Sequence, residues 1–254
     1  MHDTAYEIGR LCLQTYAKPG SIVLEIGSLD VNGSLRDACP DGVTYLGLDF
    51  EQGNGVDIFA RPGEPFPIRD GFCDLLISTS QMEHDPKFWK TFLEFCRLTK
   101  DGGTIYISSP SNGDYHTFPL DAWRFYPDAG LALQDWATEN GETLLLLESF
   151  TASRRSDQWN DFVAVFHKGA LPSTRGAYLS DHVPSYNVRQ LGSDTLIRRQ
   201  VRSEDALLVR AKDEEIARLG REIEELKEQL ATLRTAGTER VASPEPARLD
   251  PGST

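Results

Sequence analysis

Two apolar runs of the sequence end in small and acidic residues. The run at 21–28 contains Glu25 and Gly27, and the run at 44–50 ends close to Asp49. Small residues at a strand-to-helix turn let a ligand approach the backbone closely. An acid about 22 residues beyond the glycine can accept two hydrogen bonds from ribose hydroxyls. The pairing predicts a site for a nucleoside-containing ligand.

The turn after Gly27 is not the phosphate-binding turn of a dinucleotide site. It lacks the GxGxxG pattern, because no third glycine follows at the required place. An acid in the position of Asp49 fits NAD and S-adenosylmethionine equally. The missing fingerprint therefore counts against a nicotinamide-dependent oxidoreductase.

A histidine is the side chain whose ordinary pKa suits a general base near neutral pH. The chain has five. His2 lies at a terminus that we expect to be disordered, His167 ends an apolar run, and His182 lies in a polar stretch. His84 and His116, each placed just after an apolar run, remain as candidate bases, with His116 preferred.

The segment around His116 is dense in aromatic and ionisable side chains. Such a loop beside a cleft can form an acceptor platform, with a guanidinium available to an anionic group. The alternative is a rigid lid in which the aromatic residues are core. The expected acceptor-binding residues are Tyr115, Asp121, Trp123, Arg124 and Tyr126.

The elements that must position these residues follow an alternating pattern. Apolar, β-branched runs at 21–28, 44–50, 73–79 and 104–110 suit strands buried on both faces of a parallel sheet. Helical spacing marks a helix before the first run, at 3–17, and another that Asp85 and Pro86 open before the last. We expect a doubly wound, mostly parallel Rossmann-like α/β sheet. Two later runs, 143–150 and 161–168, are expected to close it as an antiparallel hairpin.

The last third of the chain has a different pattern. After a domain at 1–170, we expect a polar connector at 171–202, a coiled-coil helix at 203–236 and a disordered tail at 237–254. Glu222 at a g position can reach Lys227 of a partner, which favours a parallel homodimer. The alternative is an amphipathic helix packed on its own domain. The apolar seam consists of Ile216, Leu219, Ile223, Leu226, Leu230 and Leu233.

The charge and the apolar content of the chain limit the kinds of partner that it can bind. The formal net charge is −13, and both the α/β part and the heptad part are acidic. A negative field repels a phosphate backbone, so we expect no nucleic-acid partner. No stretch approaches the 18 or so apolar residues of a membrane span, and the start resembles no leader peptide. We expect a soluble, cytoplasmic protein whose four separated cysteines are free thiols.

Residues 20–168 resemble the class I S-adenosylmethionine-dependent methyltransferases. VLEIGSLDVNGSLRD is similar to that family's first motif, and YLGLDF to its ribose-binding strand. The segment EPFPIRDGFCDLLISTSQMEHDPKFWKTFLEFCRLTKDGGTIYISSPSNG resembles its fourth and fifth strands with the helix between them. DYHTFPLDAWRFYPDAG (114–130) is similar to a branch of small bacterial methyltransferases often associated with polysaccharide or secondary-metabolite pathways.

The resemblance implies S-adenosylmethionine as cofactor. It places Glu25 near the methionine amino group, Gly27 beneath the methionine and ribose, and Asp49 on the ribose hydroxyls. The carboxylate that relatives direct at the adenine amine is missing from the stretch 58–66, where an apolar wall is expected instead. The remaining cofactor-binding residues implied by this resemblance are Ser28, Phe50, Phe59, Ser80 and Gln81.

Some relatives hold a divalent metal with a Glu-x-x-Glu-His arrangement. Here Glu83 and His84 fill the last two positions, but Ser80 fills the first. One carboxylate and one imidazole leave a metal under-liganded, so no metal site is expected.

The function expected from these features is O-methylation of a sugar, a glycan or another small molecule. No Asn/Asp-Pro-Pro-Tyr amine-binding motif follows the 73–79 run, which favours oxygen over nitrogen as acceptor. The alternative from another class is a non-catalytic scaffold that combines a degenerate methyltransferase domain with a coiled coil. The altered stretch at 58–66 favours that alternative, and the intact Glu25, Gly27 and Asp49 oppose it.

Overall fold

The computed structural model describes residues 2–117, 119–171 and 177–241, with side chains as far as residue 235. The chain divides into two compact units, Met1–Gln200 and Val201–Thr254. We call them the α/β unit and the helical unit, and we describe each by itself.

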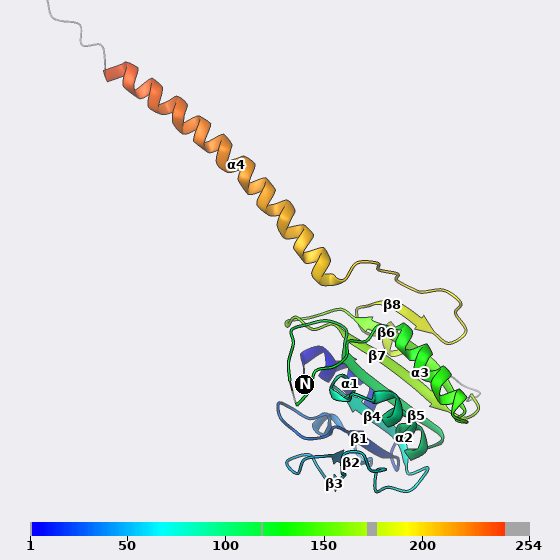
Figure 1. The fold of residues 1–254 in the computed structure, drawn as a ribbon. Coiled ribbons are helices and arrows are strands. Elements are labelled where there is room, and N and C mark those ends of the chain that lie inside the picture. Colours follow the sequence, from blue (N-terminus) through cyan, green and yellow to red (C-terminus); the bar gives the residue numbers. More distant parts are fainter. Residues whose placement is uncertain (1, 118, 172–176, 242–254) are drawn as a thin grey trace, which may run out of the picture. The chain divides into compact units, whose positions relative to one another are not determined.

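The α/β unit is built on one sheet of eight strands in the order β3-β2-β1-β4-β5-β7-β6-β8 (Figure 1). The strands from β3 to β5 run parallel, whereas β7, β6 and β8 join them antiparallel. The doubly wound, mostly parallel sheet with a C-terminal antiparallel hairpin is therefore confirmed. The strands are β1 (Ile22–Ile26), β2 (Thr44–Asp49), β3 (Ile58–Phe59), β4 (Cys73–Thr79), β5 (Thr99–Pro110), β6 (Leu144–Ala152), β7 (Asp161–Lys168) and β8 (Ser185–Gln190).

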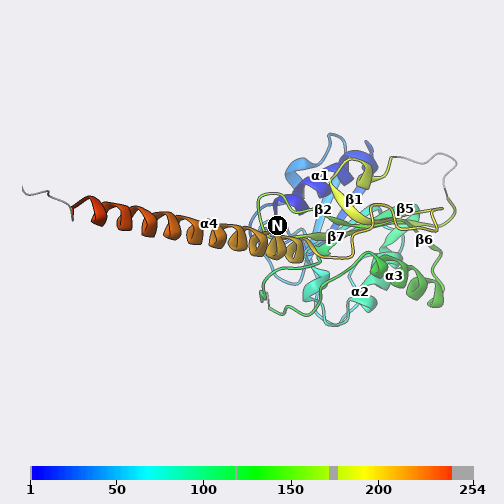
Figure 2. The same cartoon turned by 90° about the horizontal axis from the view of Figure 1, so that it is seen from above.

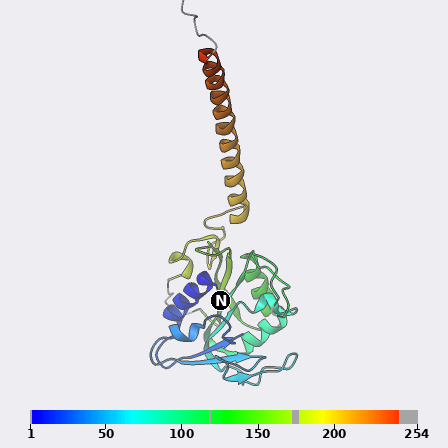
Figure 3. The same ribbon diagram turned by 90° about the vertical axis from the view of Figure 1, so that its left-hand side faces the viewer.

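Helices cover both faces of this sheet, as Figures 2 and 3 show. Because side chains alternate across a strand, Val23 packs with α1 (Asp3–Tyr16) while Leu24 packs with α2 (Phe88–Leu98) and α3 (Asp128–Glu139). Short 3-10 turns η1 (Leu35–Ala38), η2 (Met82–His84) and η3 (Leu179–Asp181) complete the layers. A sheet with apolar residues on both faces explains why its strands are continuous apolar runs in the sequence.

The segment 171–202, predicted to be a polar connector, contains regular structure. It contributes η3 and the edge strand β8, which pairs with β6. The anchor is Glu148, a fully buried carboxylate in β6 that accepts hydrogen bonds from the backbone N–H groups of Leu179 (2.6 Å) and Ser180 (3.0 Å). Burial raises the pKa of the Glu148 carboxyl. The polar sequence hides this strand because it lies at the edge of the sheet.

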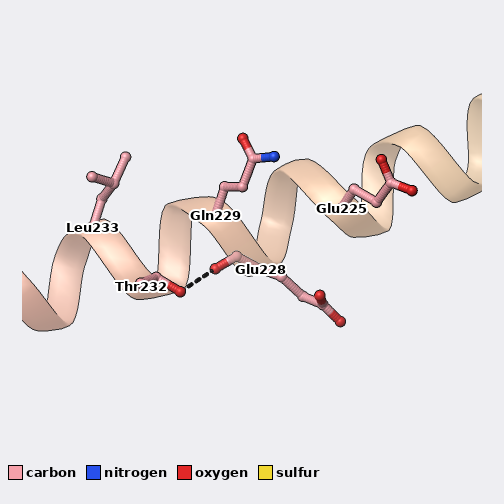
Figure 4. A pocket seen from close by; sticks show the side chains of 5 residues that line it. All are labelled: Glu225, Glu228, Gln229, Thr232 and Leu233. Atoms are coloured by element: carbon pink, nitrogen blue, oxygen red, sulfur yellow. Dashed lines mark hydrogen bonds between the residues drawn. The ribbon is translucent and has the colours of Figure 1, made fainter.

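The helical unit contains α4 (Glu204–Val241). Its described side chains are almost all exposed, including Leu226 at 51% and Leu230 at 56%. Figure 4 shows a shallow hollow on this helix, lined by Glu225, Glu228, Gln229, Thr232 and Leu233, where the Thr232 hydroxyl donates to the Glu228 carbonyl (2.9 Å).

The predicted start of the disordered tail, residue 237, is wrong, because α4 continues to Val241. Residues 242–254 lie outside the described part of the chain. Within the described ranges, no helix combines the length and apolar character needed to cross a bilayer.

Candidate functional site

The turn after β1 brings two strand ends together. Gly27 has a φ of +82°, and its N–H donates to the Leu48 carbonyl (3.0 Å). A Cβ at this position would lie 2.8 Å from the Cβ of Gln81, which follows β4. Both the backbone conformation and the close approach therefore require glycine. The turn is where β1 lies between β2 and β4, at the carboxyl edge of the parallel strands.

The turn after β4 is also unusual. Ser80 is one of three described non-glycine residues with positive φ (+51°), and its N–H donates to the Ser108 carbonyl (2.8 Å). The Ser78 hydroxyl donates to Gln81 Oε1 (3.2 Å). A side chain in the left-handed region costs about 1 kcal/mol or more, and such strain concentrates at ligand sites.

A cavity of about 1000 Å³ opens at these turns. Nine of the residues expected from the sequence line it: Glu25, Gly27, Ser28, Asp49, Phe50, Ser80, Gln81, His84 and His116. The carboxyl edge of β1, β2 and β4 thus places the expected cofactor residues and the two candidate bases around one space.

Asp49 ends β2 and holds the turn after β1. Its Oδ2 accepts from the Leu29 N–H (2.9 Å) and its Oδ1 from the Glu51 N–H (3.1 Å). A carboxylate has about four acceptor positions, so two backbone donors leave capacity for a pair of hydroxyls in the cavity. Asp49 can therefore fix the turn and bind a ribose with the same group.

Glu25 is a buried carboxyl group in the cavity wall, with 4% of its surface exposed. Burial raises the pKa of this carboxyl from 4.5 to about 7, and the nearby charges of Asp49 and Asp30 act in the same direction. A cation placed beside it would favour the ionised form. The environment suits the recognition of an amino group.

The apolar wall of the cavity is formed by other residues than the sequence predicted. Phe59 is 45% exposed and is not among the described residues that line the cavity, because it lies in the short edge strand β3. Phe50 and Phe66 form the wall instead, with ring centroids 6.1 Å apart. Glu64 also lines the cavity, so a carboxylate is present on this side after all. The role of Glu64 was not predicted because this residue precedes a Pro-Phe pair rather than the expected Leu-Pro-Phe.

The other end of the cavity carries the two histidines. His84 belongs to η2, and His116 lies in the loop after β5. Their ring centroids are 5.0 Å apart, in an edge-to-face arrangement. The Nδ1 atom of His84 is in hydrogen-bond contact with the Leu120 carbonyl. A carbonyl only accepts, so this contact puts the proton on Nδ1 and the lone pair on Nε2. Burial lowers the pKa of His84, which keeps the ring neutral.

The expected acceptor residues do not come to the cavity. Tyr115 is 78% exposed and Tyr126 is 63% exposed, and neither belongs to the described cavity lining. Trp123 packs on Phe88 and donates its Nε1–H to the Asp85 carbonyl (2.9 Å). These aromatic groups brace the loop against α2 and η2 or face outward.

Asp121 and Arg124 have a structural role in this loop. The Arg124 Nη2 donates to Asp121 Oδ2 (2.8 Å), and the same oxygen accepts from the His116 backbone N–H (2.8 Å). The Arg124 guanidinium holds the pKa of the Asp121 carboxyl well below its usual range. The pair positions His116, and the other N–H groups of Arg124 donate to the Asn112, Asp114 and Trp123 carbonyls.

His2 and Trp159 also line the cavity, although the sequence did not predict either of them there. His2, expected at a disordered terminus, stacks on Trp159 with centroids 4.8 Å apart. Its Nδ1 lies 3.2 Å from Oδ1 of the buried Asp161. Trp159 also meets the His116 ring edge-on, at 5.1 Å. No short-range pattern connects residues this far apart in the chain.

The chain is similar in sequence to known methyltransferases over part of its length. No protein-family model matches the chain. Over 120 residues it is 32% identical to an uncharacterized methyltransferase of Mycobacterium bovis and 31% identical to one of Mycobacterium leprae. These matches cover 42% of this chain and 46% and 44% of the two relatives, so the chain spans about half the length of the curated relatives it matches.

A solved structure is similar over most of the α/β unit. It is the 1,6-didemethyltoxoflavin-N1-methyltransferase of Burkholderia thailandensis, with 1,6-didemethyltoxoflavin and S-adenosylhomocysteine bound. The TM-score is 0.51 at 14% sequence identity, over 66% of this chain and 80% of that chain. The α/β unit therefore has a Rossmann-like methyltransferase fold.

Proposed function

We propose that the protein is an S-adenosylmethionine-dependent methyltransferase that acts on a hydroxyl group of a small molecule, with a sugar or glycan as the favoured class. One observation carries the proposal. A single cavity is lined by the Gly27 turn, Glu25 and Asp49 and also by the imidazoles of His84 and His116. A nicotinamide cofactor would need the phosphate-binding turn that this chain lacks.

The residues of the cavity fit the cofactor. Glu25, buried with a raised pKa, would accept hydrogen bonds from the methionine amino group, whose charge restores the carboxylate. Asp49 would accept from the ribose hydroxyls, and Gly27 leaves space for the chain of the ligand. Phe50 and Phe66 would cover the adenine, with Glu64 on the same wall. The cofactor supplies an activated methyl group, so this chain has only to orient the two reactants.

The acceptor end supplies a proton acceptor. A hydroxyl loses its proton as its oxygen attacks, and a positioned base contributes about 100-fold or more. The His116 ring is held by the Asp121–Arg124 pair and lines the cavity, so we assign it as the base. His84, with its lone pair on Nε2, is the second candidate.

Ligand binding tests the proposal. Calorimetry with the full chain should detect S-adenosylhomocysteine at one site and no NAD. Asp49→Ala should weaken the affinity by about 1 to 3 kcal/mol, the cost of losing charged hydrogen bonds. Asp41→Ala, at an exposed acid before β2, is the matched control and should leave it unchanged. Equal affinities in Asp49→Ala and the native chain would remove the site assignment.

Turnover tests the base. With hydroxylated acceptors and detection of released S-adenosylhomocysteine, His116→Ala should lower kcat by about 100-fold while the cofactor affinity stays constant. If His84→Ala abolishes turnover and His116→Ala does not, the assignment is reversed.

We also propose that α4 pairs with α4 of a second copy. Its seam residues are exposed by 43–68% in the described chain, which leaves an apolar stripe for a partner. Glu222 and Lys227 stand at the flanking positions that join parallel helices across such a seam. A homodimer through this helix follows.

A further inference from the structure

Three ligand-type side chains meet at the acceptor end of the cavity. Glu83 and His84 come from η2, and His116 comes from the loop after β5. One carboxylate oxygen and one ring nitrogen from each histidine all lie within 4.8 Å of one another. The sequence offered only Glu83 and His84 as neighbours, and the fold adds the third donor from 32 positions further along the chain.

The two imidazoles are oriented as metal ligands usually are. A ligating histidine commonly donates its second N–H to a carbonyl or a carboxylate, which fixes the ring and its tautomer. His84 Nδ1 contacts the Leu120 carbonyl, and its Nε2 lies 3.7 Å from Glu83 Oε1. His116 Nδ1 lies 3.3 Å from the Asp114 carbonyl oxygen and 3.4 Å from Asp121 Oδ2, with Arg124 Nη2 at 3.5 Å. Nε2 of His84 is then open to a ligand, and Nε2 of His116 is open in the tautomer whose Nδ1–H donates to Asp114 or Asp121.

Glu83 supplies an independent observation. Its side chain is fully buried, and within the described chain neither carboxylate oxygen has a hydrogen-bond partner. A buried acceptor without a hydrogen-bond partner destabilises the fold, and the penalty is larger for a charged group. The backbone carbonyl of Glu83 accepts from Ala122 and Trp123, so the residue is held firmly while its carboxylate is left bare. A cation bound beside this carboxyl group would satisfy both oxygens.

The geometry points to a divalent transition-metal site, and we propose that Glu83, His84 and His116 bind one ion of the zinc, manganese, iron or cobalt class. Two imidazoles with one carboxylate suit these ions, whereas magnesium and calcium prefer oxygen ligands alone. Bonds of about 2.0 to 2.2 Å place donors within roughly 4.3 Å of one another, so modest side-chain rotations close the present cluster.

Open coordination positions would face the acceptor. His84 and His116 line the cavity, whereas Glu83 lies behind them. An acceptor hydroxyl bound to the ion would have a lowered pKa and would release its proton to water. Its oxygen would then take the methyl group from the sulfonium, and S-adenosylhomocysteine would leave. This step rests on the proposed function. It also replaces the base role of His116, because one lone pair cannot both bind the ion and take a proton.

Metal binding is tested without turnover. The 254-residue chain without a tag is stripped with chelator, titrated with Co²⁺ while the visible absorption is recorded, and dialysed to equilibrium against Zn²⁺. One equivalent per chain should bind, with visible bands typical of nitrogen and oxygen ligation. Glu83→Gln, His84→Ala and His116→Ala should each lower the affinity at least 10-fold. His182→Ala, which removes an exposed imidazole elsewhere in the α/β unit, is the control and should bind like the native chain.

The outcomes separate this inference from the proposed function. Stoichiometry below one, or equal affinity in the three variants and the control, overturns the metal site even if S-adenosylhomocysteine binds. Metal binding that depends on the three residues, in a chain that binds no S-adenosylhomocysteine, supports the site and overturns the cofactor assignment. Tryptophan fluorescence verifies that each variant is folded, because all four tryptophans lie in the α/β unit.

Discussion

Replacing Glu25 by Gln should make the empty protein more stable and its cofactor binding weaker. Burial raises the pKa of the Glu25 carboxyl from 4.5 to about 7. At about 1.4 kcal/mol per pH unit, ionising this group in the folded chain costs about 3 kcal/mol more than in the unfolded chain. The amide of Gln has a similar shape and never ionises, so the variant avoids that cost.

The sign of the pH dependence follows from proton counts. Between pH 4.5 and 7 the folded chain holds the Glu25 proton while the unfolded chain has released it, so stability falls as the pH rises. The advantage of the neutral group is complete below pH 4.5 and is lost as the pH rises through about 7. Glu25→Gln should therefore exceed the native chain by about 3 kcal/mol at pH 8 and match it near pH 4.

Thermal melting followed by tryptophan fluorescence measures this difference for the α/β unit alone. For a unit of about 200 residues, 3 kcal/mol corresponds to a Tm higher by about 6 to 12 °C. S-adenosylhomocysteine should bind the variant about 10- to 100-fold more weakly, since a charged hydrogen bond is lost. A variant that is less stable at pH 8, or that keeps full affinity, would refute the assignment of Glu25 as a buried carboxyl that waits for an amino group.

Four further substitutions, in three variants, test the packing of the α/β unit and the seam of α4. Gly113→Ala should lower stability by about 3 kcal/mol and displace Trp159 from the cavity, because a Cβ there would lie 1.9 Å from the indole at a φ of +101°; urea unfolding with fluorescence detection measures both. Glu148→Ala leaves two buried N–H groups unpaired and should cost about 2 to 4 kcal/mol, with hydrogen exchange of β8 rising before that of β4. The pair Leu226→Asp and Leu230→Asp places charges in the α4 seam; light scattering should report a monomer that still binds S-adenosylhomocysteine, and a persistent dimer would move the interface elsewhere.

The strands of the site were predictable because each is a buried, continuous apolar run. The pattern gave β1, β2 and β4 and hence the neighbouring ends that carry Gly27 and Asp49. It did not give α3, whose buried positions Gly130, Leu133 and Ala137 include only one large apolar side chain. Nor did it give β8, whose attachment depends on a single buried carboxylate in β6 rather than on an apolar face.

The loop after β5 shows why residue type alone does not assign a role. Its aromatic and charged side chains suggested an acceptor platform, yet Asp121 and Arg124 satisfy each other and the backbone around them. A pair at spacing i,i+3 that is already saturated has little left to offer a ligand.

What the pair does is hold His116, which alone of the expected residues in that loop reaches the cavity. An ionised carboxylate that is paired with Arg124 and also accepts the His116 N–H fixes the backbone from which the imidazole projects. Asp121→Asn keeps the shape of the side chain but removes its charge. The imidazole of His116 should therefore become more mobile, although it remains at the cavity. The two proposed roles of that ring, as base or as metal ligand, are alternatives, and each requires the same fixed position. A variant with a mobile His116 should therefore lose metal affinity and turnover together while cofactor affinity stays constant, and the loss of only one of them would separate the two roles.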